Sequence, residues 1–138
     1  MQVTGLPPGP AEAQSLFLAV PPHGDYEKKR LWGLFDETRL CGVIDGAFAH
    51  PSPGHFWIGL ILLEPRARGR GRGASALGDV ARHARDGGAH TLSLAVKSDY
   101  LAARRFWVGQ GFVRRESRTL VMPGGPVLFD LMDRALKP

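Results

Sequence analysis

Four arginines alternate with small residues in the segment 65–74, PRARGRGRGA, which directly follows the apolar stretch 55–63, HFWIGLILL. The apolar stretch predicts a strand, and the residues after 73 place apolar side chains at helical spacing, so the segment joins a strand to a helix. The start of a helix carries unpaired backbone N–H groups and about half a positive charge, and glycines let an anion approach those donors without a Cβ in the way. The pattern predicts a phosphate-binding loop.

The net charge of +5 is concentrated in this loop. Arg66, Arg68, Arg70 and Arg72 supply +4, which leaves +1 for the rest of the chain. Charge gathered in one loop favours a phosphate-bearing ligand over a nucleic acid or an anionic surface that the whole protein would contact.

The elements around the loop predict an α/β fold of the α+β type, with a single mixed, mostly antiparallel sheet and flanking helices. The strands on either side of the helix after the loop are expected to pair in parallel through a right-handed crossover. In chain order, the patterns predict a strand or tail over 1–9, a helix over 10–20, strands over 29–36, 40–50 and 55–63, a helix ended by Gly87-Gly88, a strand over 91–96, a helix over about 100–108 capped by Ser98 or Asp99, and strands over 112–121 and 126–134.

Two motifs give the sequence a family resemblance. Residues 68–73, RGRGRG, are similar to the Gln/Arg-x-x-Gly-x-Gly/Ala signature of the GNAT superfamily of N-acetyltransferases. Residues 103–112, ARRFWVGQGF, resemble the Ala-x-x-Phe-Tyr-x-x-x-Gly-Phe segment of the same family, in the same order and at the same spacing. The similarity extends over roughly residues 30–134 and implies a GNAT-like acyl-CoA N-acyltransferase fold.

The resemblance also implies the residues that bind acetyl coenzyme A. In the family, backbone amides of the glycine loop hold the pyrophosphate, and the end of the preceding strand pairs with the pantetheine arm as an added strand would. The matching residues here are Ile61, Leu62, Leu63, Arg68, Gly69, Arg70, Gly71, Arg72, Gly73, Ala74, Phe106 and Trp107. No metal site is predicted.

Three other interpretations of the loop stay open. Residues 69–74 fit the dinucleotide pattern G-x-G-x-x-A, although that fold places its fingerprint after its first strand. An Arg-Gly run also occurs in disordered RNA-binding tracts, which lack flanking apolar periodicity. The third interpretation is a solvated basic loop that binds no ligand.

Acetyl transfer to an amine requires that amine to be neutral, so the sequence is expected to supply a base where the pKa of the amine is high. Deprotonating a lysine-type amine costs about 4 kcal/mol at neutral pH, and deprotonating an α-amine costs about 1 kcal/mol. His55 at the start of its strand, Glu64 at the end and Asp45 on the neighbouring strand are the candidates, and histidine is the side-chain type best suited to relay a proton. In the competing interpretation His55 is a surface residue beside a turn, Glu64 pairs with nearby arginines and Asp45 lies on the solvent face of its strand.

The acid that protonates the leaving thiolate differs from the family pattern. Family members often use the tyrosine of the Phe-Tyr pair, but this chain has Trp107 there, and an indole N–H does not supply that proton. Tyr100, at the start of the same predicted helix, is the candidate replacement. A thiolate with a pKa of about 8.5 can also leave directly or with the help of a water.

The composition is that of a globular protein, with 43% hydrophobic and 22% charged residues, and predicts one domain over residues 1–138. The single cysteine, Cys41, is expected to be a small buried apolar residue and suits a reducing compartment. Since the sequence shows no basic signal segment and no apolar run of membrane-spanning length, we expect a cytoplasmic protein, monomeric or homodimeric, without a membrane partner.

These observations together predict an N-acetyltransferase that moves an acetyl group from acetyl coenzyme A to a primary amine of a small molecule, amino acid or peptide by direct attack. The acceptor is expected among the early strands and the first helix, where Trp32, Phe48, Phe56 and Trp57 offer aromatic walls. Nucleic acid is not an expected partner. The alternatives are an acyl-CoA-binding sensor or pseudoenzyme without transfer activity, and a basic nucleic-acid-binding module.

Overall fold

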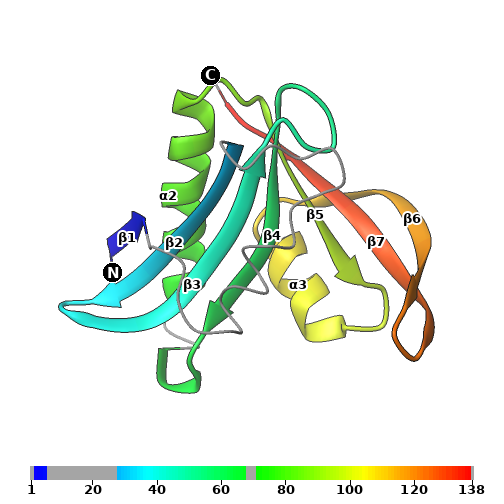
Figure 1. Cartoon of the computed structure of the whole chain (residues 1–138), viewed down its shortest axis with the longest axis horizontal. Coiled ribbons are helices and arrows are strands. Elements are labelled where there is room, and N and C mark those ends of the chain that lie inside the picture. Colours follow the sequence, from blue (N-terminus) through cyan, green and yellow to red (C-terminus); the bar gives the residue numbers. More distant parts are fainter. Residues whose placement is uncertain (1, 6–27, 68–70, 138) are drawn as a thin grey trace.

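Seven strands form one sheet in a computed structural model that describes residues 2–5, 28–67 and 71–137. The strand order is β1-β2-β3-β4-β5-β7-β6, and β4 with β5 is the parallel pair in an otherwise antiparallel sheet. The elements are β1 (Gln2–Gly5), β2 (Lys29–Asp36), β3 (Arg39–Phe48), β4 (His55–Leu63), the 3-10 turn η2 (Pro65–Ala67), α2 (Arg72–Asp86), β5 (Thr91–Lys97), α3 (Leu101–Gly109), β6 (Val113–Met122) and β7 (Gly125–Ala135). Figure 1 shows α2 crossing behind β2 and β3, and α3 beside the separating ends of β4 and β5.

The predicted mixed, mostly antiparallel α/β sheet is confirmed. β2 and β4 have the predicted bounds, because turn residues stand directly at their ends. β3 begins one residue before the predicted 40–50 strand and ends two residues before its end. β1 falls within the predicted strand or tail over 1–9, and the helix predicted over 10–20 lies outside the described residues.

The core lies between the sheet and α2. The predicted apolar face of this helix is buried, with Leu77 fully inaccessible to solvent, and burial of one such side chain contributes about 1.5–3 kcal/mol. Cys41 is buried as predicted, and its Sγ lies 3.3 Å from the carbonyl oxygen of Leu34. The sheet side of this core includes Trp32, Leu34, Ile44, Phe56, Ile58, Leu92, Leu94, Val96 and Met132. Within the described residues, no helix is long and apolar enough to cross a membrane.

One extra residue interrupts the regular alternation of β4. Asp45 of β3 pairs with Leu60, and Gly46 pairs with Ile58, so Gly59 is the additional residue of a β-bulge. Before the bulge Phe56 and Ile58 face α2, and after it Ile61 and Leu63 do. The bulge therefore keeps apolar side chains in the core while it changes the direction of the main chain.

A buried carboxylate of β7 holds α3 against the sheet. Asp130 accepts hydrogen bonds from the hydroxyls of Ser98 at 2.7 Å and Ser117 at 2.9 Å, and Arg104 Nε of α3 lies 3.0 Å from its Oδ2. The predicted cap of this helix is therefore wrong. The N-cap residue is Tyr100, which makes no side-chain cap hydrogen bond, and the Ser98 hydroxyl donates to Asp130 instead.

We expect Asp130→Asn to destabilise the protein in a pH-dependent way. The Ser98 hydrogen bond, followed by Ser117 and Arg104, lowers the pKa of the Asp130 carboxyl although burial opposes this. The native state thus gains stability from the charged form above the unfolded pKa of about 3.9 and loses that stability as the pH falls through the lower native pKa. Urea unfolding at pH 7, 5 and 3 should show a gap between the two proteins that shrinks toward acid, and a gap of equal size at pH 3 and 7 would contradict the assignment.

Candidate active site

β4 and β5 run side by side over a short distance and then separate. Their parallel register joins His55 to Thr91 at one end and Ile58 to Leu94 at the other, and it stops where the bulge at Gly59 begins. β4 continues beside β3 as far as Leu63, while β5 continues beside β7. Figure 1 shows this divergence, with α3 next to it. Beyond Ile58, no strand among the described residues pairs with the edge of β4 that β5 has left.

The start of α2 lies directly beyond the end of β4. Its N-cap, Gly71, has a φ of 71°, in the left-handed region that favours glycine, and a Cβ built at this position would have no atom within 4 Å. The first backbone hydrogen bond of the helix runs from the N–H of Ser75 to the carbonyl oxygen of Gly71. The N–H groups before Ser75 therefore have no acceptor within the helix.

Arg72 makes a contact that the sequence did not suggest. Its guanidinium lies 2.7 Å from the carboxylate of Asp36 at the end of β2, and this contact lowers the pKa of Asp36. It ties the start of α2 to the sheet, so the charge of Arg72 is partly matched by protein. Arg68, Gly69 and Arg70 of the predicted loop lie outside the described residues.

Three predicted cofactor residues from different elements converge at this helix start. A Cβ on Gly73 would lie 3.3 Å from Cζ of Phe106 on α3 and 3.8 Å from Cδ1 of Leu63 on β4. Trp107 packs against the core, with its ring centroid 5.2 Å from that of Phe112. Gly73 thus allows close packing of α2 on α3, and the described end of the first motif meets the motif at 103–112 at the divergence of β4 and β5.

The other predicted cofactor residues follow the same strand end and helix start. The side chain of Ile61 packs against the core, whereas that of Leu62 is exposed on the other face of the sheet. Ala74 lies in the first turn of α2.

The three predicted catalytic residues do not lie together. Glu64 follows β4 and forms an ion pair with Arg39, with Arg66 4.0 Å away, as the competing interpretation expected. Tyr100 is 58% exposed at the N-cap of α3. His55 lies at the opposite end of β4.

His55 takes part in a hydrogen-bond chain on the sheet face opposite α2. It is half-buried, its Nδ1 lies 2.7 Å from the Ser93 hydroxyl, and that hydroxyl donates to Asp133 Oδ1 at 2.8 Å. Arg115 Nε in turn lies 2.9 Å from Asp133 Oδ2. The sequence indicated His55 but not its partners, which come from three other strands.

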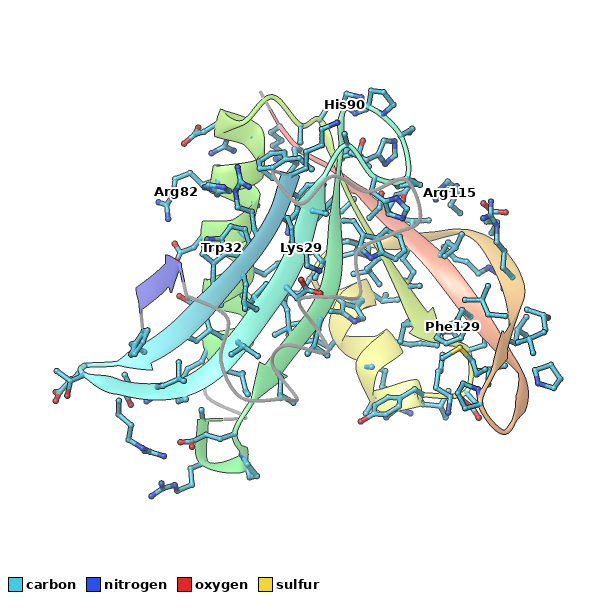
Figure 2. The ribbon with its side chains drawn as sticks, in the orientation of Figure 1. Lys29, Trp32, Arg82, His90, Arg115 and Phe129 are labelled. Atoms are coloured by element: carbon cyan, nitrogen blue, oxygen red, sulfur yellow. The ribbon has the colours of Figure 1, made fainter. Side chains whose placement is uncertain are left out.

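Asp45 is buried, so its expected place on the solvent face is wrong. It forms an ion pair with Lys29, whose side chain is also buried and is labelled in Figure 2. Burial raises the pKa of the Asp45 carboxyl, and Lys29 opposes that shift. A Cβ on Gly59 would lie 2.7 Å from Asp45 Oδ2, so this pair lies beside the bulge at the divergence. The isolated glycine in an apolar strand was the one sequence signal for this feature.

The proposed aromatic walls divide between core and surface. Trp32 and Phe56 are core residues, and Trp57 is half-buried against the ring of His50 at 4.9 Å. Phe48 borders an open pocket of about 470 Å³. That pocket is lined by Lys28, Arg30, Phe48, His83, Asp86 and Gly87, none of which is a predicted cofactor residue.

Comparison with solved structures shows the same fold. Nourseothricin acetyltransferase is 21% identical with a TM-score of 0.70, over 82% of this chain and 68% of that chain. An acetyltransferase from Thermus thermophilus is 26% identical with a TM-score of 0.67, over 91% of this chain and 71% of that chain. A structure from Bacillus anthracis str. Ames in complex with acetyl coenzyme A, provisionally assigned as a streptothricin acetyltransferase, is 17% identical with a TM-score of 0.70, over 80% of this chain and 64% of that chain.

Sequence comparison gives the family. No curated protein matches the chain. The profile of the acetyltransferase (GNAT) family matches residues 6–112, which include the glycine loop and both strands that diverge beside it. Because this match spans well over half of the sequence, the chain belongs to the acetyltransferase (GNAT) family.

Proposed function

We propose that this protein transfers an acetyl group from acetyl coenzyme A to a primary amine of a small molecule, amino acid or peptide. The observation that carries the proposal is that β4 separates from β5 at Gly59, and that the next helix, α2, begins with a glycine N-cap just beyond the end of β4. A ligand with a phosphate at one end and an extended amide-bearing arm at the other matches both features. We further propose a single domain over residues 1–138 that acts in the cytoplasm as a monomer or homodimer.

The residues present fit acetyl coenzyme A. The open space at Gly71 leaves room for a phosphate beside the N–H groups of the first turn of α2, at Gly73 and Ala74. Ile61, Leu62 and Leu63, on the side of β4 that β5 has left, are the proposed main-chain partners of the pantetheine amides. Arg68, Gly69 and Arg70 complete the proposed phosphate loop, and Phe106 and Trp107 form its wall on α3.

The chemistry supplied by this co-substrate is an activated acetyl thioester, and the protein contributes mainly position and fixed backbone dipoles. The bulge at Gly59 interrupts the hydrogen bonds between β3 and β4 at the divergence. We propose that a main-chain N–H group freed there donates a hydrogen bond to the thioester carbonyl. Glu64 is a less suitable base than His55, because its carboxylate already pairs with Arg39. Tyr100 stays the proposed acid for the thiolate, and departure without an acid is the alternative.

The acceptor we propose is a monoamine, preferably an α-amine. Two solved structures with the same fold are named as a phosphinothricin N-acetyltransferase, provisionally, and as a chimera of spermidine N-acetyltransferase. Among the described residues, four carboxylates around the divergence already have cationic partners: Asp36 pairs with Arg72, Asp45 with Lys29, Glu64 with Arg39, and Asp133 with Arg115. A polycation needs several carboxylates for its desolvated ammonium groups.

We expect α-amines to be acetylated faster than polyamines. The test supplies acetyl coenzyme A with L-alaninamide, an Ala-Ala dipeptide, spermidine or kanamycin at about pH 7.5 and detects the released thiol with a dye, since an α-amine is partly neutral there. Turnover of spermidine or kanamycin about tenfold above the α-amines would refute the acceptor class. Tight binding of acetyl coenzyme A with no turnover of any amine would favour the alternative, an acyl-CoA sensor without transfer activity.

A further inference from the structure

The chain through His55, Ser93 and Asp133 fixes which ring nitrogen of His55 carries the proton. Ser93 has one hydroxyl hydrogen, which points to Asp133 Oδ1 at 2.8 Å. A carboxylate only accepts hydrogen bonds, so this hydrogen is not available to His55. The Ser93 oxygen must then accept the N–H of His55 Nδ1 across 2.7 Å. In the neutral ring, Nε2 is left as the nitrogen with a lone pair.

The fold builds this chain from strand register. Ser93 and Asp133 are direct partners on β5 and β7, and Ser93 is completely buried. Arg114 pairs with Met132 and Glu116 with Leu131, so Arg115 is the extra residue of a bulge in β6. Bulges redirect side chains, and here the guanidinium of Arg115 reaches Asp133. The carboxylate is thus held from two sides, by Ser93 and by Arg115.

The hydrogen-bond chain through His55, Ser93 and Asp133 lies next to the divergence of β4 and β5. Ser93 is the register partner of Trp57, one residue before Ile58, the last residue of β4 that pairs with β5. The ring of His55 reaches along the sheet toward Ser93, and therefore toward the divergence. His55 and Trp57 both face away from the core residue Phe56, on the side opposite α2.

Four titratable or charged groups face His55. Asp133 and Arg115 belong to the hydrogen-bond chain itself. The ring centroid of His90 lies 5.5 Å from that of His55, at the end of the sheet where Figure 2 labels His90. His50 is the fourth group, and burial and the charge of His55 both lower the pKa of His50. Among the described residues, the carboxylate that belongs to this group is that of Asp133.

We propose that His55 is the proton acceptor of the acetyl transfer through Nε2, and that Ser93 and Asp133 are positioning residues that hold its tautomer. This inference rests on the proposed function. The ammonium of the acceptor gives one proton to Nε2, directly or through one water, and the freed lone pair forms the C–N bond while the C–S bond of the thioester breaks. The coenzyme A thiolate takes its proton from Tyr100, or from water if it leaves without an acid; the second amine proton restores that group, and the imidazolium of His55 returns its proton to solvent.

The first measurement reads the tautomer without any substrate. Long-range ¹H–¹⁵N spectra of the uniformly ¹⁵N-labelled protein at about pH 8, where a free imidazole is neutral, distinguish the Nδ1–H ring from the Nε2–H ring. We expect Nδ1–H in the wild type and loss of that preference in Ser93→Ala. The matched control is Ser98→Ala, which removes a hydroxyl from a second Ser–Asp–Arg group, Ser98 with Asp130 and Arg104, that contains no histidine. That control should keep the Nδ1–H signal of His55.

The second measurement follows kcat/KM for L-alaninamide from pH 6.5 to 9. Ser93→Ala and His55→Gln should lose about tenfold near pH 7, mainly in kcat, and should approach the wild type near pH 9, where the α-amine is already neutral. Ser98→Ala should stay within about twofold throughout. A variant impaired only through its fold would lose activity at every pH, and circular dichroism melting identifies such a variant directly.

An Nε2–H tautomer in the wild type would overturn the inference, and so would a Ser93→Ala profile that matches Ser98→Ala. If the wild type turns over no amine in the panel, the proposed function fails and the proton-transfer role fails with it. The spectra still decide in that case whether Ser93 and Asp133 hold the ring. The two failures are therefore distinguishable.

Discussion

Gly71→Glu should weaken acetyl coenzyme A binding by roughly 30- to 150-fold, because a carboxylate beside the proposed phosphate position costs about 2–3 kcal/mol. Among the described residues, no atom lies within 4 Å of a Cβ at Gly71, so the new side chain starts in open space beside the proposed phosphate position. Isothermal titration of the coenzyme into wild type and variant measures the loss directly.

Two control variants separate charge from backbone strain. Gly71→Gln has nearly the same size and the same cost at a φ of 71°, about 1–2 kcal/mol, but no charge. Gly78→Glu puts the same charge on the exposed face of α2, where a Cβ also meets no atom. We expect intermediate binding for the first and unchanged binding for the second. Binding of Gly71→Glu within threefold of the wild type would show that the phosphate does not lie at this helix start.

Asp45→Asn should destabilise the fold by about 3–5 kcal/mol, because it leaves the buried ammonium of Lys29 without its counter-charge. The side chains of both residues are almost completely buried, at 2% exposure for Lys29 and 4% for Asp45. Urea unfolding at neutral pH measures the change. A loss of less than about 1 kcal/mol would mean that the pair behaves as a hydrated surface ion pair and not as a buried one.

The double variant Lys29→Met with Asp45→Asn completes the test. Removing both charges should cost less than either single change, since no buried charge then lacks a partner. Asp79→Asn serves as the surface control, because its ion pair with Arg82 on α2 is exposed and pairs of this kind contribute about 0–1 kcal/mol. If the double variant lost the sum of the two single losses, the residues would act independently.

The sequence predicted what local patterns determine. The bounds of β4 follow from a turn at 51–54 and an apolar stretch that ends at the loop, and the buried face of α2 follows from apolar residues at helical spacing. The glycine start of α2 was predictable for the same reason. Each of these features depends on residues that are close together in the sequence.

Features that depend on register between distant strands were missed. Ser98 is a good cap by residue type, but its hydroxyl donates to Asp130, 32 residues away, and this contact replaces the local cap. Lys29 meets Asp45 because β2 and β3 pair, and Ser93 meets Asp133 because β5 and β7 pair across 40 residues. A polar residue in a strand shows its type in the sequence, but its partner follows only from the assembled sheet.

The divergence also has a mechanical consequence. The strands β1 to β4 form one half of the sheet and β5, β7 and β6 form the other, and the seam between them is the short parallel register from His55–Thr91 to Ile58–Leu94. If acetyl coenzyme A binds as proposed, an arm paired along β4 beyond Gly59 would lengthen that seam and join the two halves. Binding of the co-substrate would then make the sheet more rigid at the place where the acetyl group is presented, and release of coenzyme A would reverse this.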